Sequence, residues 1–255
     1  MDKIVIDKKR CIGCGKCVRD CVASALYLKN GKATLRSGCI ECGHCYAICP
    51  TGAVDMPDYD TSGCAQTVPM SDIDSEVFLQ AIKSRRTIRQ FKPQPVEPEK
   101  IRKILEAGRY APTASNGQKV GFTILDTRRG EIEKLCVNLF RKGVDIGSKF
   151  IRSWRHTEIT DSFFFKDAPL VIVVSGSDSV NPSLASAYME LMANSLGLGV
   201  LYSGFFCACT ILNPKVKKML HLPRGHKAVS CMIIGYPAVE YKRIPPRKEK
   251  KVRRV

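Results

Sequence analysis

The chain has 255 residues, 44% of them hydrophobic and 25% charged, and a formal net charge of +17 at pH 7. This length allows one large domain or two modest ones. Residues 1–10 lack the apolar core of a signal peptide, and no apolar run approaches the roughly 18 residues that a membrane span requires. We therefore expect a soluble, cytoplasmic protein without a membrane partner. The 13 cysteines are an odd number, which argues against a disulfide framework.

Eight of the cysteines form two short runs, CIGCGKCVRDCV at 11–22 and CIECGHCYAICP at 39–50. Each run has the spacing C-x2-C-x2-C-x3-C, and every cysteine of the first recurs 28 residues later in the second. Such a repeat predicts two similar halves, neither complete alone. The spacing resembles that of bacterial ferredoxins with two [4Fe-4S] clusters, in which the fourth cysteine of each run binds the other run's cluster. The ligands expected for one cluster are Cys11, Cys14, Cys17 and Cys49, and those for the other are Cys39, Cys42, Cys45 and Cys21.

Two zinc sites are the alternative. A structural zinc ion takes four ligands, so eight thiolates would need two ions, and zinc ribbons lack the third cysteine of each run. We therefore favour the iron–sulfur interpretation. One departure from the ferredoxin pattern is Val22, which follows Cys21 where proline is expected. Valine has a backbone N–H, and its donation to a cluster sulfur would tune the reduction potential.

We predict that residues 1–57 form the two-cluster domain, residues 58–73 a linker and residues 74–255 a second domain. Bound metal would supply the stability that the small core of the first domain cannot. The linker mixes Asp, Ser, Gly and Pro without apolar periodicity. Cys64 in the linker, and Cys136 and Cys231 beyond it, lie outside both repeats and are not expected to bind iron.

The second domain begins with a predicted helix over 75–85, which Asp74 caps and which carries an apolar stripe at Val77, Phe78, Ala81 and Ile82. The next helix is predicted to begin at Pro98, because proline suits the first helical position. The later elements are predicted, in order, as a polar turn at 111–118, a strand at 120–125, a helix at 131–150 broken near Gly143, a strand at 169–175, an apolar helix at 183–198, a short helix at 213–220 and a strand at 228–236.

Three separated segments of this domain resemble the FMN-dependent nitroreductase family: SRRTIRQF at 84–91, APTASNGQ at 111–118, and LGLGVLYSGFF, GYP and RIPPR between 198 and 247. With the preceding cysteine runs, the chain is similar to the ferredoxin-fused branch of that family. Arginine suits the FMN phosphate because its guanidinium is a planar fork of donors. The resemblance implies that Arg85, Thr87 and Arg89, with Arg86 beside them, hold the phosphate, the ribityl chain and the pyrimidine edge. It also implies that residues from a second subunit approach the flavin: Thr113, Ala114, Ser115, Asn116 and Gln118. Ser203 and Gly204 align with the turn whose backbone amide faces the reactive nitrogen of the flavin ring. Arg247 is a candidate ligand of the phosphate.

The resemblance implies an α+β fold, in which a small two-cluster ferredoxin-type domain precedes a nitroreductase-like α/β sandwich with a mostly antiparallel sheet. It also implies a homodimer with flavins at its interface, for which the apolar helix at 183–198 is suited. The expected activity is that of an oxidoreductase that passes electrons from two clusters to FMN and on to a nitroaromatic, quinone, enone or flavin acceptor. The alternatives are an electron-transfer protein that uses FMN as a reservoir, and a branch specialised in reductive dehalogenation or flavin cleavage. No side chain stands out as a catalytic acid, so none is named.

The cysteine runs also bear on the electron donor. A cluster passes single electrons, NAD(P)H delivers hydride, and no dinucleotide fingerprint is present. Basic residues precede Cys11 and crowd the chain beyond Tyr241, which favours steering of an acidic ferredoxin or flavodoxin. No nucleic-acid module is recognisable, so a nucleic-acid partner is not favoured.

Trp154, Tyr202 and the run Phe163–Phe165 are expected to line the acceptor pocket or to pack in the core.

Overall fold

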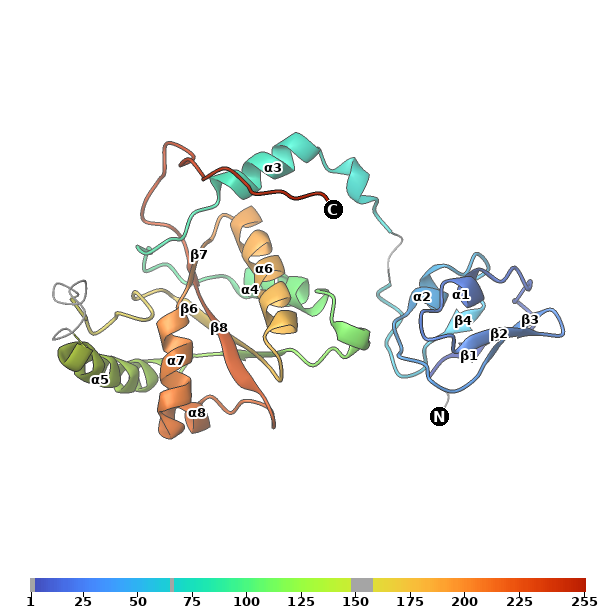
Figure 1. The fold of residues 1–255 in the computed structure, drawn as a ribbon, viewed down its shortest axis with the longest axis horizontal. Helices are drawn as coiled ribbons and strands as arrows, with labels where there is room; N and C mark the ends of the chain where they lie inside the picture. The colour runs from blue at the N-terminus through green and yellow to red at the C-terminus, as the bar shows by residue number, and fades with distance from the viewer. Residues whose placement is uncertain (1–2, 65–66, 148–157) are drawn as a thin grey trace. The chain divides into compact units, whose positions relative to one another are not determined.

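The computed structural model describes residues 3–64, 67–147 and 158–255, which divide into two compact units (Figure 1). The first, the cysteine unit, comprises Met1–Asp72 together with the short segment Thr113–Gly117. The second, the sheet unit, comprises Ile73–Pro112 and Gln118–Val255. Each unit has its own hydrophobic core.

The cysteine unit repeats its backbone as well as its sequence. Helices α1 (Lys16–Arg19) and α2 (His44–Ala47) each follow a glycine in the left-handed region, Gly15 at φ 69° and Gly43 at φ 75°. Positive φ angles recur at the same 28-residue offset in two further pairs, Gly13 with Glu41 and Ser24 with Gly52. The strands form two antiparallel pairs, β1 (Val5–Ile6) with β4 (Val54–Asp55) and β2 (Leu26–Lys29) with β3 (Lys32–Leu35). The 3-10 helices η1 (Met70–Asp72) and η2 (Ala114–Asn116) also belong to this unit.

The sheet unit is built on a four-stranded antiparallel sheet in the order β5–β6–β8–β7. One of its two central strands, β6, is buried along its whole length, which explains why residues 170–174 are continuously apolar rather than alternating. The strands are β5 (Gly121–Ile124), β6 (Leu170–Gly176), β7 (Gly199–Tyr202) and β8 (Lys227–Gly235).

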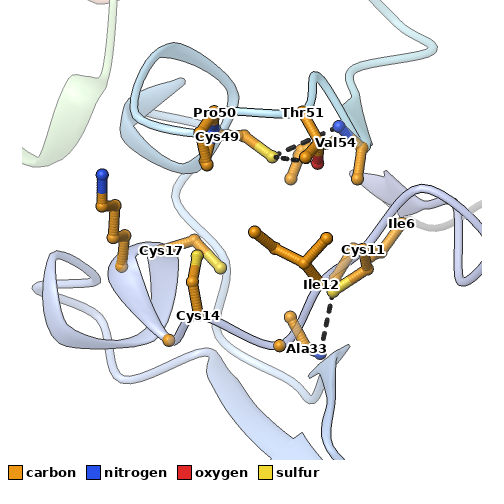
Figure 2. A pocket seen from close by; sticks show the side chains of 14 residues that line it. Ile6, Cys11, Ile12, Cys14, Cys17, Ala33, Cys49, Pro50, Thr51 and Val54 are labelled. Atoms are coloured by element: carbon orange, nitrogen blue, oxygen red, sulfur yellow. Dashed lines mark hydrogen bonds between the residues drawn. The ribbon is translucent and has the colours of Figure 1, made fainter.

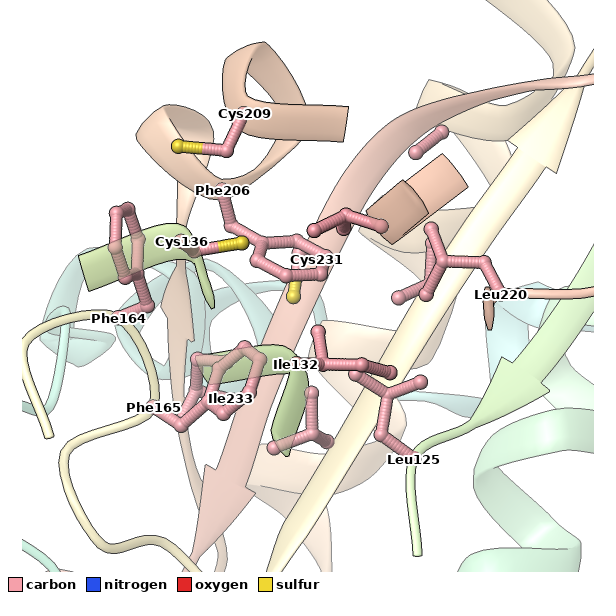
Figure 3. Packing of buried hydrophobic residues seen from close by; sticks show 14 of the residues in the cluster. Leu125, Ile132, Cys136, Phe164, Phe165, Phe206, Cys209, Leu220, Cys231 and Ile233 are labelled. Carbon is pink, nitrogen blue, oxygen red and sulfur yellow. The ribbon is translucent and has the colours of Figure 1, made fainter. Parts of the chain in front are cut away.

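Helices cover both faces of this sheet and make it a three-layer sandwich. Because successive side chains of a strand point to opposite faces, Val171 and Val173 belong to one core cluster while Ile172 and Val174 belong to the other. Figure 3 shows the first cluster, which includes residues of α5 (Arg129–Gly147), α7 (Gly204–Leu212) and α8 (Pro214–Met219). The second cluster includes residues of α4 (Pro98–Arg109) and α6 (Val180–Ser195).

Helix α3 (Ser75–Ser84) differs from the other long helices because none of its residues is buried. It begins as the sequence predicts, with the Asp74 carboxylate accepting the backbone N–H groups of Glu76 and Val77, each at 2.9 Å. Its predicted apolar stripe is solvent-exposed, with Phe78 39% and Ile82 40% accessible. The apolar stripe therefore lies on the surface of the described part of the chain.

The expected fold class is confirmed by the antiparallel sheet and its two helical layers. The predicted break near Gly143 is wrong, because α5 runs through this residue without interruption. The sequence also missed two elements in GLGVLYSGFF, namely β7 and the start of α7. Trp154 lies outside the described residues. None of the described helices combines the length and the apolar composition that a membrane crossing requires.

Candidate cofactor-binding sites

Two cavities of the cysteine unit are lined by the two predicted ligand sets. The first cavity is lined by Cys49 together with the first three cysteines of the first run. The second cavity is lined by Cys21 together with the first three cysteines of the second run. Figure 2 shows the first cavity, with the side chains of Cys14 and Cys17 next to each other and Ile12 between the cysteines. The fourth cysteine of each run thus lines the cavity of the other run, as the ferredoxin resemblance implies. In the described part of the chain, no three His, Cys, Asp or Glu side chains are arranged as ligands of a single metal ion.

Backbone geometry sets these cavities. A Cβ on Gly13 would lie 2.0 Å from the carbonyl oxygen of Gly31, so only glycine allows the first run to approach β2 and β3 this closely. The N–H of Ala25 donates to Cys21 Sγ at 3.2 Å, and the N–H of Ala53 donates to Cys49 Sγ at the same distance. These equivalent bonds orient the sulfur atoms of Cys21 and Cys49, the fourth cysteines of the two runs.

The expectation that the Val22 N–H donates to a cluster sulfur stays a prediction. Val22 is 80% exposed, and the N–H that reaches the neighbouring Cys21 sulfur is that of Ala25. The side chain that replaces proline at this position therefore lies on the surface, and Ala25 makes the bond to Cys21 that Ala53 makes to Cys49.

Burial affects the acidity of the ligand thiols. It raises the pKa of Cys17, and it raises the pKa of Cys45 to about 11. Burial acts in the same direction on Cys49, but hydrogen bonds from Ala53 and Thr51 outweigh it and lower the pKa of that thiol. Because thiolates are the metal-binding form, loading of the buried cysteines releases protons.

The second site lies in the sheet unit, where three separated segments meet beside the edge strand β7. Thr87 forms a parallel bridge with Val200, and the Ile88 N–H donates to the Val200 carbonyl at 3.1 Å. A few residues later, the Lys92 N–H donates to the Tyr236 carbonyl at 2.8 Å. The segment 84–91 is thus held between β7 and the chain that follows β8.

This meeting requires a glycine in β7. A Cβ on Gly199 would lie 2.2 Å from Cγ1 of Ile88 and 3.1 Å from Cγ of Pro237. Gly199 therefore lets the predicted flavin segment approach the sheet edge. A second glycine, Gly197 at φ 79°, ends α6 in the left-handed region, which is the usual role of glycine after a helix.

A cavity of about 480 Å³ opens between these segments. Its volume is within the usual range of small-molecule sites, about 300–1,000 Å³. Arg85 and Arg86 line it, together with Ile82 of α3, Leu191 of α6 and Tyr241 of the tail. Two guanidinium groups beside apolar walls suit a ligand with an anionic end and an apolar body.

Arg85 has an ion-pair partner that the sequence did not indicate. Its Nη1 lies 2.8 Å from Oε1 of Glu190 on α6. Glu190 is 8% exposed and is the only charged residue of that helix. Tyr202 adjoins the pair, since burial and the Glu190 carboxylate both raise the pKa of its phenol. The sequence feature that could have drawn attention to Glu190 is that it is a single acid in an otherwise uncharged helix.

The remaining predicted flavin residues of the sheet unit lie on the same edge or on the surface. The Thr87 carbonyl accepts from the Tyr241 hydroxyl at 3.5 Å, whereas Arg89 and Arg247 are exposed. Ser203 is buried, and its N–H donates to the Cys231 carbonyl at 2.8 Å. Gly204 begins α7, and a Cβ added there would meet no atom within 4 Å.

The predicted segment at 111–118 divides between the units. Thr113, Ala114, Ser115 and Asn116 belong to the cysteine unit, whereas Gln118 belongs to the sheet unit. Within the cysteine unit, Asn116 Nδ2 donates to the carbonyl oxygens of Ile40 and Glu41 at 3.3 and 2.9 Å. Their flavin contacts stay a prediction.

The aromatic candidates divide between core and surface. Phe164 and Phe165 are each 1% exposed and pack with Phe206 in the core (Figure 3). Phe163 is partly buried against the same cluster. Core packing is therefore the correct interpretation of these phenylalanines, while Tyr202 lies beside the Arg85–Glu190 pair.

Two family models match the chain, one over each of the two regions described above. Residues 82–236 match the nitroreductase family, and residues 10–54 match the 4Fe-4S dicluster domain. A protein of Methanothermobacter thermautotrophicus, whose name pairs NADH dehydrogenase with NAD(P)H nitroreductase, is 27% identical over 63% of this chain and 77% of its own length. An NADPH-dependent oxidoreductase of Staphylococcus haemolyticus is 27% identical over 64% of this chain and 66% of its own.

Solved structures show the same fold for the sheet unit. A nitroreductase with bound FMN from Bacteroides fragilis superimposes with a TM-score of 0.54 at 25% identity, over 69% of this chain and 98% of its own. A nitroreductase with bound FMN from Desulfitobacterium hafniense gives a TM-score of 0.58 at 20% identity, over 71% of this chain and 100% of its own.

Proposed function

The chain belongs to the nitroreductase family, and we propose that it is an FMN-dependent oxidoreductase supplied with electrons by two [4Fe-4S] clusters. The observation that carries the proposal is the arginine-lined cavity formed where segment 84–91 meets β7 and the chain after β8. Two of the three segments that resemble the family, 84–91 and the series between 198 and 247, contribute residues to its lining. The FMN-bound relative from Bacteroides fragilis supports FMN as the ligand.

Two of the residues that line the cavity suit the phosphate of FMN. Arg85 and Arg86 would hold the phosphate, because arginine binds phosphate by charge-assisted hydrogen bonds. Thr87 and Arg89 would contact the ribityl chain and the pyrimidine edge, while Ser203 and Gly204 would face the ring. The bound flavin would supply two-electron chemistry, which single-electron clusters cannot perform alone.

The cluster ligands are the two sets of four cysteines that line the two cavities. Because thiolate ligands must stay reduced, we place the protein in the cytoplasm. The acceptor is a small organic molecule of the nitroaromatic, quinone, enone or flavin class. Turnover of such acceptors separates this function from that of an FMN reservoir for a partner enzyme.

We also propose a homodimer. The exposed apolar stripe of α3, which includes Val77, Phe78 and Ile82, would pack against the second copy. Residues 113–116 and Gln118 would then approach the flavin of the second subunit.

The physiological donor is proposed to be an acidic one-electron carrier, because the chain holds two clusters and an excess of basic residues. The two curated relatives, whose names refer to NADH or NADPH, favour a nicotinamide donor as the second candidate. Stopped-flow reduction of the anaerobic holoprotein by ferredoxin and by NADPH distinguishes them. Reduction by ferredoxin should slow steeply with salt, because exposed charges are screened within about 8 Å at physiological ionic strength.

The variants Cys14→Ala and Cys42→Ala test the relay in the full-length chain. Each should slow flavin reduction by ferredoxin and leave reduction by dithionite intact. Equal rates with NADPH in the wild type and both variants, together with no reaction with ferredoxin, would refute the relay. Purified full-length protein that contains no flavin would refute the proposed function itself.

A further inference from the structure

Helix α6 places one carboxylate in an apolar environment. Glu190 is the only charged residue of the helix and is 8% exposed, and its neighbours on the buried side include Met189 and Ala193. A buried carboxylate is costly unless a cation or hydrogen bonds compensate it. Its presence therefore requires an explanation in terms of its partners.

The first partner is Arg85, whose Nη1 lies 2.8 Å from Glu190 Oε1. Guanidinium carries five N–H donors, and this contact engages one terminal nitrogen. The side chain of Arg85 is 26% exposed, and the residue also lines the cavity of about 480 Å³. Arg85 thus has one end of its guanidinium on Glu190 while it borders the cavity.

The second neighbour is Tyr202 at the end of β7. Its hydroxyl donates to the Ser186 carbonyl at 2.9 Å, and the Glu190 carboxylate lies close enough to raise the pKa of the phenol. Burial and the nearby carboxylate keep this phenol protonated, because both raise its pKa. Tyr202 therefore borders the Arg85–Glu190 pair on the strand side, and Arg85 is the cation that compensates the carboxylate.

We propose that Glu190 is a positioning residue for the phosphate-binding arginine, holding Arg85 in place before the flavin binds. The inference rests on the proposed function, since it takes Arg85 as a phosphate ligand. A long arginine side chain loses conformational freedom when it binds a ligand. The Glu190 contact removes that freedom in advance and directs the guanidinium to the cavity wall.

The opposite role for Glu190 predicts a change of opposite sign. A carboxylate beside Arg85 could compete with phosphate for the same charge, and its removal would then tighten FMN binding. If it positions Arg85, its neutralisation weakens FMN binding by the cost of ordering one mobile side chain, about 2- to 12-fold. The sign of the change separates the two roles.

The experiment is calorimetric titration of FMN and of riboflavin into full-length protein freed of flavin under anaerobic conditions. Glu190→Gln should weaken FMN by about 2- to 12-fold and leave riboflavin unchanged, because riboflavin lacks the phosphate. Glu99→Gln is the matched control, since Glu99 forms an exposed ion pair with Arg102 on α4. This control should bind both flavins as the wild type does.

A double-mutant cycle with Arg85→Ala completes the test. In the Arg85→Ala background, Glu190→Gln should have no further effect on FMN affinity, because the residue that it positions is gone. Equal weakening of FMN and riboflavin, tighter FMN binding, unchanged FMN binding or an additive cycle would overturn the proposal. If Glu190→Gln does not fold, Glu190→Asp retracts the carboxylate and should still weaken FMN selectively. A wild type that binds neither flavin would refute the proposed function instead.

Discussion

The substitution Gly199→Ala tests the contact that forms the candidate flavin site. The new Cβ would lie 2.2 Å from Cγ1 of Ile88 and 2.8 Å from its Cβ. Ile88 is 6% exposed and its N–H is bonded to Val200, so it has little room to retreat. Relief of the clash requires Ile88 to move by about 1 Å, which shifts its neighbours Thr87 and Arg89 from the strand edge.

We expect this overpacking to destabilise the sheet unit by about 1–3 kcal/mol. For a domain of this size, the loss lowers the melting temperature by about 2–4 °C per kcal/mol. FMN affinity should fall as well, because the segment that carries Arg85, the proposed phosphate ligand, moves. Differential scanning fluorimetry and flavin titration measure the two effects.

The control is Gly204→Ala, because a Cβ at that position meets no atom within 4 Å. Its melting temperature should be close to that of the wild type. A second control is Ile88→Ala combined with Gly199→Ala, which removes Cγ1 and should cost less than the sum of the two single changes. Wild-type stability and FMN affinity in Gly199→Ala would refute the argument that this glycine is required by close packing.

Three further predictions follow from individual residues. Cys14→Ala should lower anaerobic iron content from about eight to about four atoms per chain, whereas Cys64→Ser should leave it unchanged, as iron and sulfide analysis would show. Gly143→Ala should raise stability to urea by about 0.5–1 kcal/mol, because α5 is continuous there; a loss of stability would indicate a helix break. Asp74→Ala should destabilise α3 by about 1 kcal/mol, seen as faster amide exchange in its first turn, and unchanged exchange would contradict the observed cap.

The sequence predicted those features that depend on fixed spacing. The two cysteine runs share an offset of 28 residues, and this offset reappears in the positive φ angles of Gly13 and Glu41. Glu41 takes the backbone conformation of a glycine without being one, so no residue type announced it. The cysteine spacing predicted which residues share a cavity, while the strain at Glu41 becomes visible only in the structure.

Features that depend on packing between distant segments were harder to predict. GLGVLYSGFF contains a strand and the start of a helix, but its glycines suggest a loop. Gly199 is required because Ile88, 111 residues earlier in the chain, packs against it. Likewise, the predicted break at Gly143 overestimated a glycine that the helix accommodates at modest cost. The effect of a glycine therefore depends on its neighbours in space.

Glu190 shows how the two kinds of information combine. A single acid in an apolar helix is visible in the sequence, but its partner Arg85 lies 105 residues away. A buried acid that only stabilised the fold could be paired with any cation, whereas this one is paired with an arginine that borders the cavity. The pairing joins α6 and the end of α3 at the cavity, so we expect a change at either residue to alter both stability and ligand binding. Separate measurement of FMN and riboflavin affinity distinguishes these contributions, because only FMN reports on the phosphate end.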